Sequence, residues 1–369
     1  MKANTHTNRG TTRRLRTALG SAVAVCAVAT ALPGVARAES ADVGVRASGI
    51  ERVSVATDGA QSDGSSTDAS ITPDGSRIVF SSTATNLGDT PTTAADRVHL
   101  RDRRTGETRR IGGEAPLHPP TISADGGYVG YPVGWLQSDL IRLHQVRTGN
   151  TIGHNCMAHN CEMSLGAEGL QLAYSRRFRP PEPNQRITVL DWRSNKSYTI
   201  DVIHNTAPSK PSLSDNGGFL AYQDGEEQDV FVWDRSNGTP AGPIEGPAKA
   251  ATLVQLSDDG SKVVYLSGSD THVHDTRSGT ARTVPNVRGV AIDPTGRYLL
   301  YAPHEAGGPA LVLRDLESGT DETVSNRPAS AGIDAVSAGG RAVVFHSTAD
   351  DLVPGDTNGT SDLFVRSFR

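Results

Sequence analysis

The densest group of chemically capable side chains is the stretch His154-Asn-Cys156-Met-Ala-His159-Asn-Cys161. Two cysteines close together in an exported chain normally pair, and a Cys156–Cys161 disulfide would close a small local loop. The alternation of imidazole and thiol also suits Zn²⁺ or copper. We expect the disulfide, because the cysteines of zinc sites are usually spaced more tightly within each pair, and we keep the metal site as the alternative.

Basic and imidazole side chains near this stretch form a second group. Two histidines and one arginine each stand five residues before the Ser or Asp that opens a repeated turn, which would place them at equivalent positions of a repeat. Guanidinium and imidazole groups donate hydrogen bonds to carboxylates and phosphates. With two arginines from a neighbouring loop, the candidate ligand-binding residues are His118, His159, Arg176, Arg179 and Arg288. The alternative is that these are exposed loop side chains without a shared ligand.

An acidic segment near the carboxyl end holds a third group, with oxygen side chains at Asp356, Asn358 and Asp362. These three could contribute to a Ca²⁺ site, which requires six to eight oxygen ligands. Their glycine falls two places too early for the helix-loop-helix calcium motif, and no helix is expected to follow. Asx turns that lead into a strand explain the same residues better, so calcium is a weak candidate.

Catalytic motifs are missing from the chain after its amino-terminal segment. No serine there stands in Gly-x-Ser-x-Gly, and no His-Glu-x-x-His occurs. The sequence therefore assigns no catalytic residue and requires no cofactor, with Ca²⁺ or Zn²⁺ kept as the alternative.

The elements that must position these residues are short strands that recur along the chain. Seven segments resemble Ser-x-Asp-Gly followed by a β-rich run that ends in an aromatic residue, and no sustained helical periodicity interrupts them. Their turn glycines are Gly75, Gly126, Gly169, Gly217, Gly260, Gly296 and Gly340. Intervals of 36 to 51 residues between these glycines match the length of a propeller blade.

Each unit is expected to contain four strands, a to d, with a tight turn between a and b and another between c and d. An aspartate that ends strand c is expected to cap the second turn. The last unit stops after its third strand, whereas residues 50–55 form an unassigned strand at the start. Pairing of residues 50–55 with 363–366 would close the ring and remove the exposed sheet edges. The fold class is all-β, a seven-bladed β-propeller of four-stranded blades.

These turn and strand motifs resemble the TolB-like, WD-repeat-like family of β-propellers. The carboxyl-terminal stretch from Ser347 to Arg366 resembles a version common in secreted bacterial proteins, and the resemblance covers residues 49–369. It implies the propeller fold. It says little of function, because propellers include both binding platforms and enzymes.

The amino terminus has the pattern of an export signal. Arg13, Arg14 and Arg16 precede an apolar run, and Ala36-Arg37-Ala38 is a small-x-small cleavage site. We expect residues 1–38 to be a signal peptide of the Sec or possible twin-arginine type, and residues 39–369 to be one secreted domain. Cleavage leaves 30 basic against 41 acidic residues, which argues against nucleic acid as a partner.

Loop length indicates where a ligand would bind. The a–b and c–d turns share one face and are short, whereas the b–c and d–a loops share the other, the top face, and are long. Because irregular loops on a rigid scaffold favour binding sites, we expect a monomeric, secreted binding or scaffold protein. Its top-face loops would recognise an extracellular protein, peptide or glycan. The alternative is an extracellular lyase or hydrolase that acts on a polysaccharide or peptide.

Overall fold

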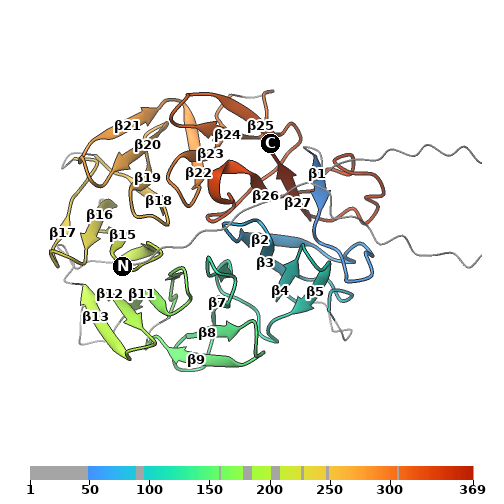
Figure 1. The fold of residues 1–369 in the computed structure, drawn as a ribbon, viewed down its shortest axis with the longest axis horizontal. Coiled ribbons are helices and arrows are strands. Elements are labelled where there is room, and N and C mark those ends of the chain that lie inside the picture. The colour runs from blue at the N-terminus through green and yellow to red at the C-terminus, as the bar shows by residue number, and fades with distance from the viewer. Residues whose placement is uncertain are drawn as a thin grey trace, which may run out of the picture. The chain divides into compact units, whose positions relative to one another are not determined.

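The computed structural model describes residues 49–368 except 89–94, 158, 178–184, 201–207, 226–227, 247–248 and 306. The predicted signal peptide and Arg179 lie outside these described residues. Seven antiparallel sheets follow one another around a central axis in chain order (Figure 1). The fold is a seven-bladed β-propeller, as the repeat predicts.

Six blades consist of four consecutive strands paired in sequence order. Blades one to three contain β2 (Ser66–Ile71), β3 (Arg77–Ser82), β4 (Arg97–Asp102) and β5 (Glu107–Arg110); β6 (Thr121–Ile122), β7 (Tyr128–Val133), β8 (Leu140–Gln145) and β9 (Thr151–Asn155); β10 (Met163–Leu165), β11 (Gln171–Arg177), β12 (Gln185–Asp191) and β13 (Lys196–Ile200). Blades four to six contain β14 (Ser209–Leu213), β15 (Phe219–Asp224), β16 (Asp229–Asp234) and β17 (Pro240–Ala241); β18 (Thr252–Leu256), β19 (Lys262–Ser267), β20 (Asp270–Asp275) and β21 (Ala281–Val284); β22 (Val287–Ile292), β23 (Tyr298–Pro303), β24 (Leu311–Asp315) and β25 (Asp321–Ser325).

The seventh blade joins the two ends of the described chain. Its sheet has the order β1-β27-β26, with β1 (Ile50–Arg52) from the start of the chain and β26 (Ala342–Ser347) and β27 (Asp362–Ser367) from its end. The antiparallel register pairs Ile50 with Arg366 and Arg52 with Phe364, which confirms the predicted closing strand. The innermost strand of this blade is reduced to two isolated bridges to β26, Ser330 with His346 and Val336 with Val343, followed by the 3₁₀ turn η1 (Ala338–Gly340).

Hydrogen bonds within the a–b turn explain the repeated Ser-x-Asp-Gly sequence. In blade two the Ser123 hydroxyl donates to Asp125 Oδ1 over 2.6 Å and accepts from the Tyr128 N–H over 2.9 Å. Gly126 has a φ of 68°, in the left-handed region that a residue with a Cβ rarely adopts. Equivalent residues in four other blades make the second of these bonds, which ties strand a to strand b: Thr72, Ser214, Ser257 and Ser337.

The aspartates at the end of strand c cap the next turn, as predicted. Asp102 Oδ1 accepts from the N–H groups of Arg104 and Thr105, and Asp275 Oδ1 accepts from those of Arg277 and Ser278. Their role is therefore structural.

Neighbouring a–b turns are also bonded to one another around the bottom face. The Asp125 N–H donates to the Ala167 carbonyl, the Ala167 N–H to the Asp215 carbonyl, and the Asp215 N–H to the Asp258 carbonyl. Backbone bonds between turns hold the inner ends of successive blades in fixed positions. The bottom of the central channel is therefore built from mutually anchored backbone.

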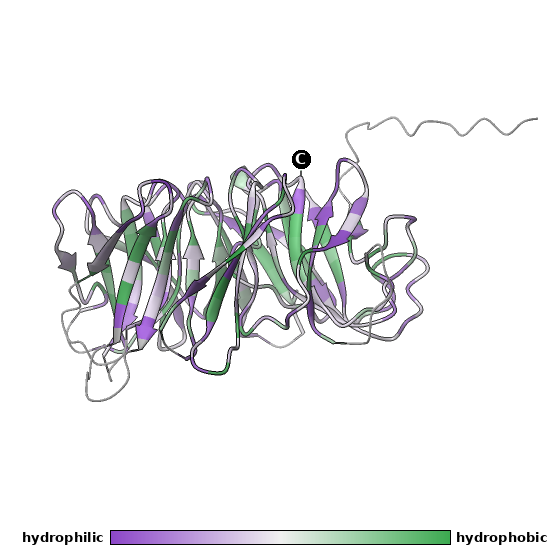
Figure 2. Ribbon diagram, turned by 90° about the horizontal axis from the view of Figure 1, so that it is seen from below, coloured by the Kyte–Doolittle hydropathy of each residue, from purple (hydrophilic) through white to green (hydrophobic). Residues whose placement is uncertain are grey.

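Apolar side chains fill the space between blades, and Figure 2 shows the hydrophobic colour concentrated along the strands. One buried cluster includes Phe80 of blade one, Phe345 and Phe364 of blade seven, and Leu300 of blade six. It therefore extends across the junction where the ends of the chain meet. Packing as well as strand pairing closes the ring.

The Cys156–Cys161 disulfide is present, and both cysteines are fully buried. Asp139 anchors the loop that the disulfide closes: its carbonyl accepts from the Cys156 N–H over 3.2 Å and its Oδ2 accepts from the Cys161 N–H over 3.3 Å. Sulfurs joined in this way are not thiolate ligands for a metal.

Candidate functional site

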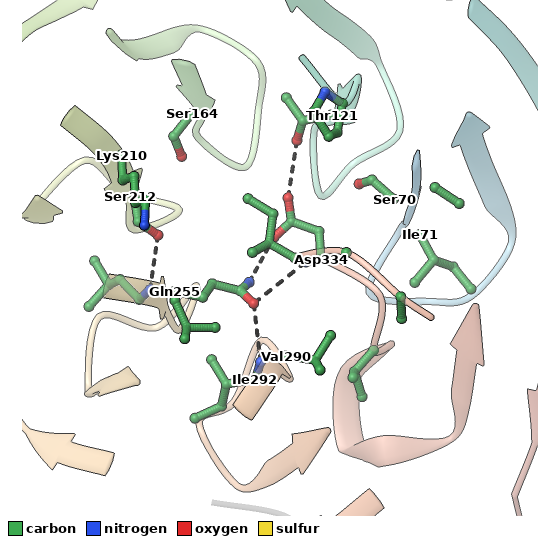
Figure 3. A pocket seen from close by; sticks show the side chains of 18 of the residues that line it. Ser70, Ile71, Thr121, Ser164, Lys210, Ser212, Gln255, Val290, Ile292 and Asp334 are labelled. Carbon is green, nitrogen blue, oxygen red and sulfur yellow. Dashed lines mark hydrogen bonds between the residues drawn. The ribbon is translucent and has the colours of Figure 1, made fainter. Parts of the chain in front are cut away.

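A cavity of about 560 Å³ lies along the propeller axis and is lined by residues from all seven blades. The innermost strands β2, β6, β10, β14, β18 and β22 supply most of its wall, together with residues 329–334 of blade seven. Figure 3 shows these strands converging on the axis with polar side chains between them. We call the end near the start of the innermost strands the channel mouth, and the end near the a–b turns the channel floor.

A belt of polar side chains links successive blades halfway along this channel. Ser164 Oγ accepts from the Leu213 N–H over 3.0 Å, and Ser212 Oγ accepts from the Leu256 N–H over 2.9 Å. In both cases the donor belongs to the next blade. These hydroxyls occupy the same place in their repeats, five residues before the turn glycine, so the belt is a repeated interblade contact.

Asp334 of blade seven extends this belt across the channel. Its Oδ1 accepts from Gln255 Nε2 over 2.7 Å and its Oδ2 accepts from Thr121 Oγ1 over 3.2 Å, as the dashed lines in Figure 3 show. Asp334 has a φ of 57°, an uncommon conformation that functional and strained positions share. One carboxylate thereby connects blades two, five and seven, and its burial raises its pKa.

Two further carboxylates, Asp215 and Asp258, lie at the channel floor in adjacent a–b turns. Burial and then the charges of Asp334 and Asp259 raise the pKa of Asp215 to about 6. Burial and then the charges of Asp215 and Asp334 raise the pKa of Asp258 well above its usual range. The lower part of the channel is therefore an acidic environment in which like charges repel.

The channel mouth carries charges of both signs. Lys210, Arg288 and His118 line it together with Asp68 and Glu162. Glu162 Oε2 accepts a hydrogen bond from the Lys210 N–H, and partial burial lowers the pKa of the Lys210 ammonium group. A ligand at the mouth would therefore meet a guanidinium, an ammonium, an imidazole and two carboxylates.

The structure separates the residues that the sequence grouped as ligand-facing. His118 and Arg288 line the cavity. His159 is exposed and lies 3.5 Å from Asp139 Oδ1, because the disulfide holds its loop against Asp139. Arg176 contacts the Met157 sulfur and is not among the cavity residues. Arg179 lies outside the described residues.

The three residues weighed for calcium lie in the seventh blade, away from the channel, and bind protein groups. Asp362 is fully buried and accepts from Ser54 Oγ over 2.5 Å and from Gln61 Nε2 over 2.9 Å. Asp356 Oδ1 accepts from the same Gln61 amide over 2.7 Å. Asn358 Oδ1 accepts from the Thr360 N–H, an Asx turn.

Among the described residues, no group of three or more His, Cys, Asp and Glu side chains could hold a metal ion. Within the same part of the chain, no helix is long and apolar enough to cross a membrane.

Sequence reasoning missed Lys210, Asp215, Asp258 and Asp334. A signal for two of them was present in the repeat. The residue two places before the turn glycine is Pro or Ala in five units and Asp in two consecutive ones, at 215 and 258. Comparison of that position across the seven units would have marked both as exceptions.

No family model and no curated protein matches this sequence. Among solved structures, an oligogalacturonate lyase in complex with manganese aligns over 87% of this chain and 93% of its own, with 14% identity and a TM-score of 0.61. The oligogalacturonate lyase of Vibrio parahaemolyticus aligns over the same shares, with 12% identity and a TM-score of 0.61. TolB from Acinetobacter baumannii aligns over 67% of this chain and 63% of its own, with 16% identity and a TM-score of 0.47.

At such identities the two lyases share the fold with this chain and nothing finer. Their alignments cover most of the described chain, and the blade count and the closure through β1 follow from the strand order of this structure itself. The protein is a seven-bladed β-propeller with four-stranded blades.

Proposed function

We propose that the protein is a secreted binding protein that recognises an extracellular protein, peptide or glycan at the mouth of its central channel. The observation that carries this proposal is the 560 Å³ cavity lined by all seven blades. Concave sites of this size that combine apolar walls with a few polar groups are typical of ligand sites. The described residues of the chain contain neither of the catalytic motifs Gly-x-Ser-x-Gly and His-Glu-x-x-His, which would favour an enzyme.

The mouth residues favour a ligand that offers both anionic and cationic groups. Arg288 is exposed and presents a planar fork that suits a carboxylate. Lys210 adds a second cation, whereas Asp68 and Glu162 favour ammonium or guanidinium groups. A peptide segment carries both kinds of charge, so among the three ligand classes a peptide or an exposed protein segment fits the mouth best.

The disulfide supports export. Cystines persist in oxidising compartments outside the cytosol, and the buried Cys156–Cys161 bond is compatible with an extracellular protein. Secretion through the segment 1–38 is part of the proposal.

The test is a screen of the mature protein against peptide and glycan arrays. Hits are repeated with the double variant Lys210→Gln/Arg288→Gln and with the control Arg193→Gln/Arg277→Gln, which removes two positive charges from exposed turns outside the channel. We expect the channel variant to lose at least about tenfold in affinity, since hydrogen bonds to charged groups are at stake, and the control to bind normally.

Equal binding by the channel variant, or loss of binding in the control alone, would place the site elsewhere. Mass spectrometry of each hit after incubation addresses the alternative of a lyase or hydrolase. A cleaved glycan or peptide would replace the binding proposal with an enzymatic one.

A further inference from the structure

We propose that the channel floor is a subsite for an alkylammonium group, such as a lysine side chain or the free amino terminus of a peptide. This inference rests on the proposed function, since it requires the ligand to enter the central channel. It adds the chemical class of the group that binds deepest.

The first support is that the two floor carboxylates have no partner. In the described part of the chain, neither Asp215 nor Asp258 makes a side-chain hydrogen bond or ion pair. Asp293, in the equivalent turn of the next blade, is fully buried and its Oδ1 accepts from the N–H groups of Arg297 and Tyr298. A carboxylate left unpaired in a partly buried site is costly, and a cation would relieve that cost.

The second support is the number of negative charges that face the same space. Asp334 lies above the floor, and it acts electrostatically on both Asp215 and Asp258. Its two oxygens accept from Gln255 and Thr121, so it is already fixed in place. A compact ammonium group with three donors would satisfy acceptors that come from several directions.

Ser70 provides an observation independent of the acidic residues. It lines the same cavity at the level of the polar belt, is only 3% exposed, and its hydroxyl has no hydrogen-bond partner among the described residues. Figure 3 shows that hydroxyl on the channel side of β2. Equivalent hydroxyls of Ser164 and Ser212 accept from the next blade. A buried unpaired hydroxyl costs free energy unless a ligand completes it.

The spacing of the acidic residues favours an ammonium group over a metal ion. A divalent cation requires several oxygens within about 2.0–2.6 Å of one point, and no group of three or more His, Cys, Asp and Glu side chains among the described residues could hold a metal ion. An alkylammonium group accepts longer contacts of about 2.7–2.9 Å and attraction from carboxylates beyond that distance. Its alkyl chain would follow the apolar wall formed by residues such as Leu256 and Ile292.

The experiment uses two pairs of small probes and the mature protein. Nα-acetyl-lysine methylamide is compared with its Nε-acetylated form, and alanyl-alanine with N-acetyl-alanyl-alanine. Isothermal titration calorimetry at pH 7.5 and low salt measures each affinity. We expect binding of at least one free amine and none of its acetylated counterpart, and the pair that responds identifies a lysine side chain or a peptide amino terminus as the source.

Three variants locate the subsite. We expect Asp215→Asn/Asp258→Asn to weaken binding of the responding amine at least about tenfold, and Ser70→Ala to weaken it about fivefold. Asp350→Asn, which removes an exposed carboxylate outside the cavity, should leave the affinity unchanged. Thermal melting monitored by circular dichroism verifies that each variant is folded, and Ser70→Ala tests the site if the double Asn variant is not.

The inference is overturned if neither amine binds, or if folded variants of the floor and of Ser70 bind the amine as well as the parent does. Its failure is distinguishable from failure of the proposed function. If array ligands lose affinity in the Lys210/Arg288 variant but not in the floor variants, only the proposed site at the channel mouth is supported. If a small amine binds but no array ligand is found, only the proposed subsite at the channel floor is supported.

Discussion

Two groups of buried or partly buried carboxylates differ in what surrounds them: those of the seventh blade, where the ends of the chain meet, and those of the channel. In the seventh blade, Asp362 accepts from Ser54, Gln61 and Asn358. Arg52 lies 3.8 Å from Asp362 and 3.5 Å from Asp356. We call this paired group the closure cluster.

In the channel, by contrast, Asp215 and Asp258 have no side-chain partner among the described residues, and their pKa values are raised. Both groups consist of the same residue types in the same fold. The difference shows that an acidic cluster acquires its role from its partners: the closure cluster stabilises the ring, whereas the channel floor leaves its charges available to a ligand.

Removal of residues 49–56 should have the largest effect. It removes the ladder from β1 to β27 and takes both Arg52 and Ser54 from the closure cluster. We expect a loss of more than about 5 kcal/mol of stability and an exposed sheet edge that promotes aggregation. Thermal melting and light scattering measure both, with deletion of residues 39–48 as the length control. A variant as stable and as monomeric as the parent would contradict closure through β1.

Arg52→Ala should have the next largest effect on stability, because it leaves the carboxylates of the closure cluster without a cation, as those of the channel floor are. Asp356 and the fully buried Asp362 would lose their cation. Breaking a buried pair typically costs about 3–5 kcal/mol. Chemical denaturation should show this loss, whereas Arg104→Ala, whose guanidinium is largely exposed beside Asp102, should change stability by less than about 1 kcal/mol. If the two variants lose the same stability, burial does not make the ion pairs of Arg52 worth more than that of Arg104.

Asp215→Asn should act in the opposite direction. The pKa of Asp215 in the folded protein, about 6, lies above its usual 3.8 because of burial and the charges of Asp334 and Asp259. The folded state therefore holds the proton more tightly, and stability from this group is full below about pH 4 and is lost as the pH rises through 6. An asparagine at position 215 does not ionise, so the variant does not lose this stability as the pH rises.

We expect Asp215→Asn to be more stable than the parent by about 2 kcal/mol at pH 7.5 and to approach it at pH 4. Melting curves across this range provide the measurement. A variant that is less stable than the parent at pH 7.5 would show that Asp215 has a stabilising partner, and the contrast with the closure cluster would fail.

Much of the fold was predictable from the sequence because its signals are local and repeated. The turn glycines have a positive φ in all seven units, and the missing strand of the last unit correctly indicated β1. The disulfide followed from the short spacing of the two cysteines and from the export that the sequence predicts.

The site was less predictable, because a channel wall is assembled from residues that lie far apart in sequence. His118 and Arg288 line the cavity, whereas His159 lies beside Asp139. The count of five residues used Ser164 as the start of the third turn, but the bond from the Gly169 N–H to the Gly166 carbonyl shows that this turn begins at Gly166. Asp334 bonds Thr121 and Gln255 from other blades, and no pattern along the chain encodes which side chains meet across a ring.

A pair of serines gives the smallest and most direct test of the comparison. Ser54 is fully buried; its hydroxyl donates to Asp362 and accepts from the Leu363 N–H over 3.0 Å. Ser54→Ala should therefore cost about 1–3 kcal/mol, because it leaves a buried carboxylate and a buried N–H without this partner. Ser70 is almost as buried but has no partner among the described residues, so Ser70→Ala should be neutral or stabilising by up to about 1 kcal/mol in the absence of ligand. Parallel urea denaturation of the two variants compares them under one condition. If Ser70→Ala lowers the free energy of unfolding as much as Ser54→Ala does, the Ser70 hydroxyl stabilises the fold. Ser70 would then no longer support a ligand site in the channel.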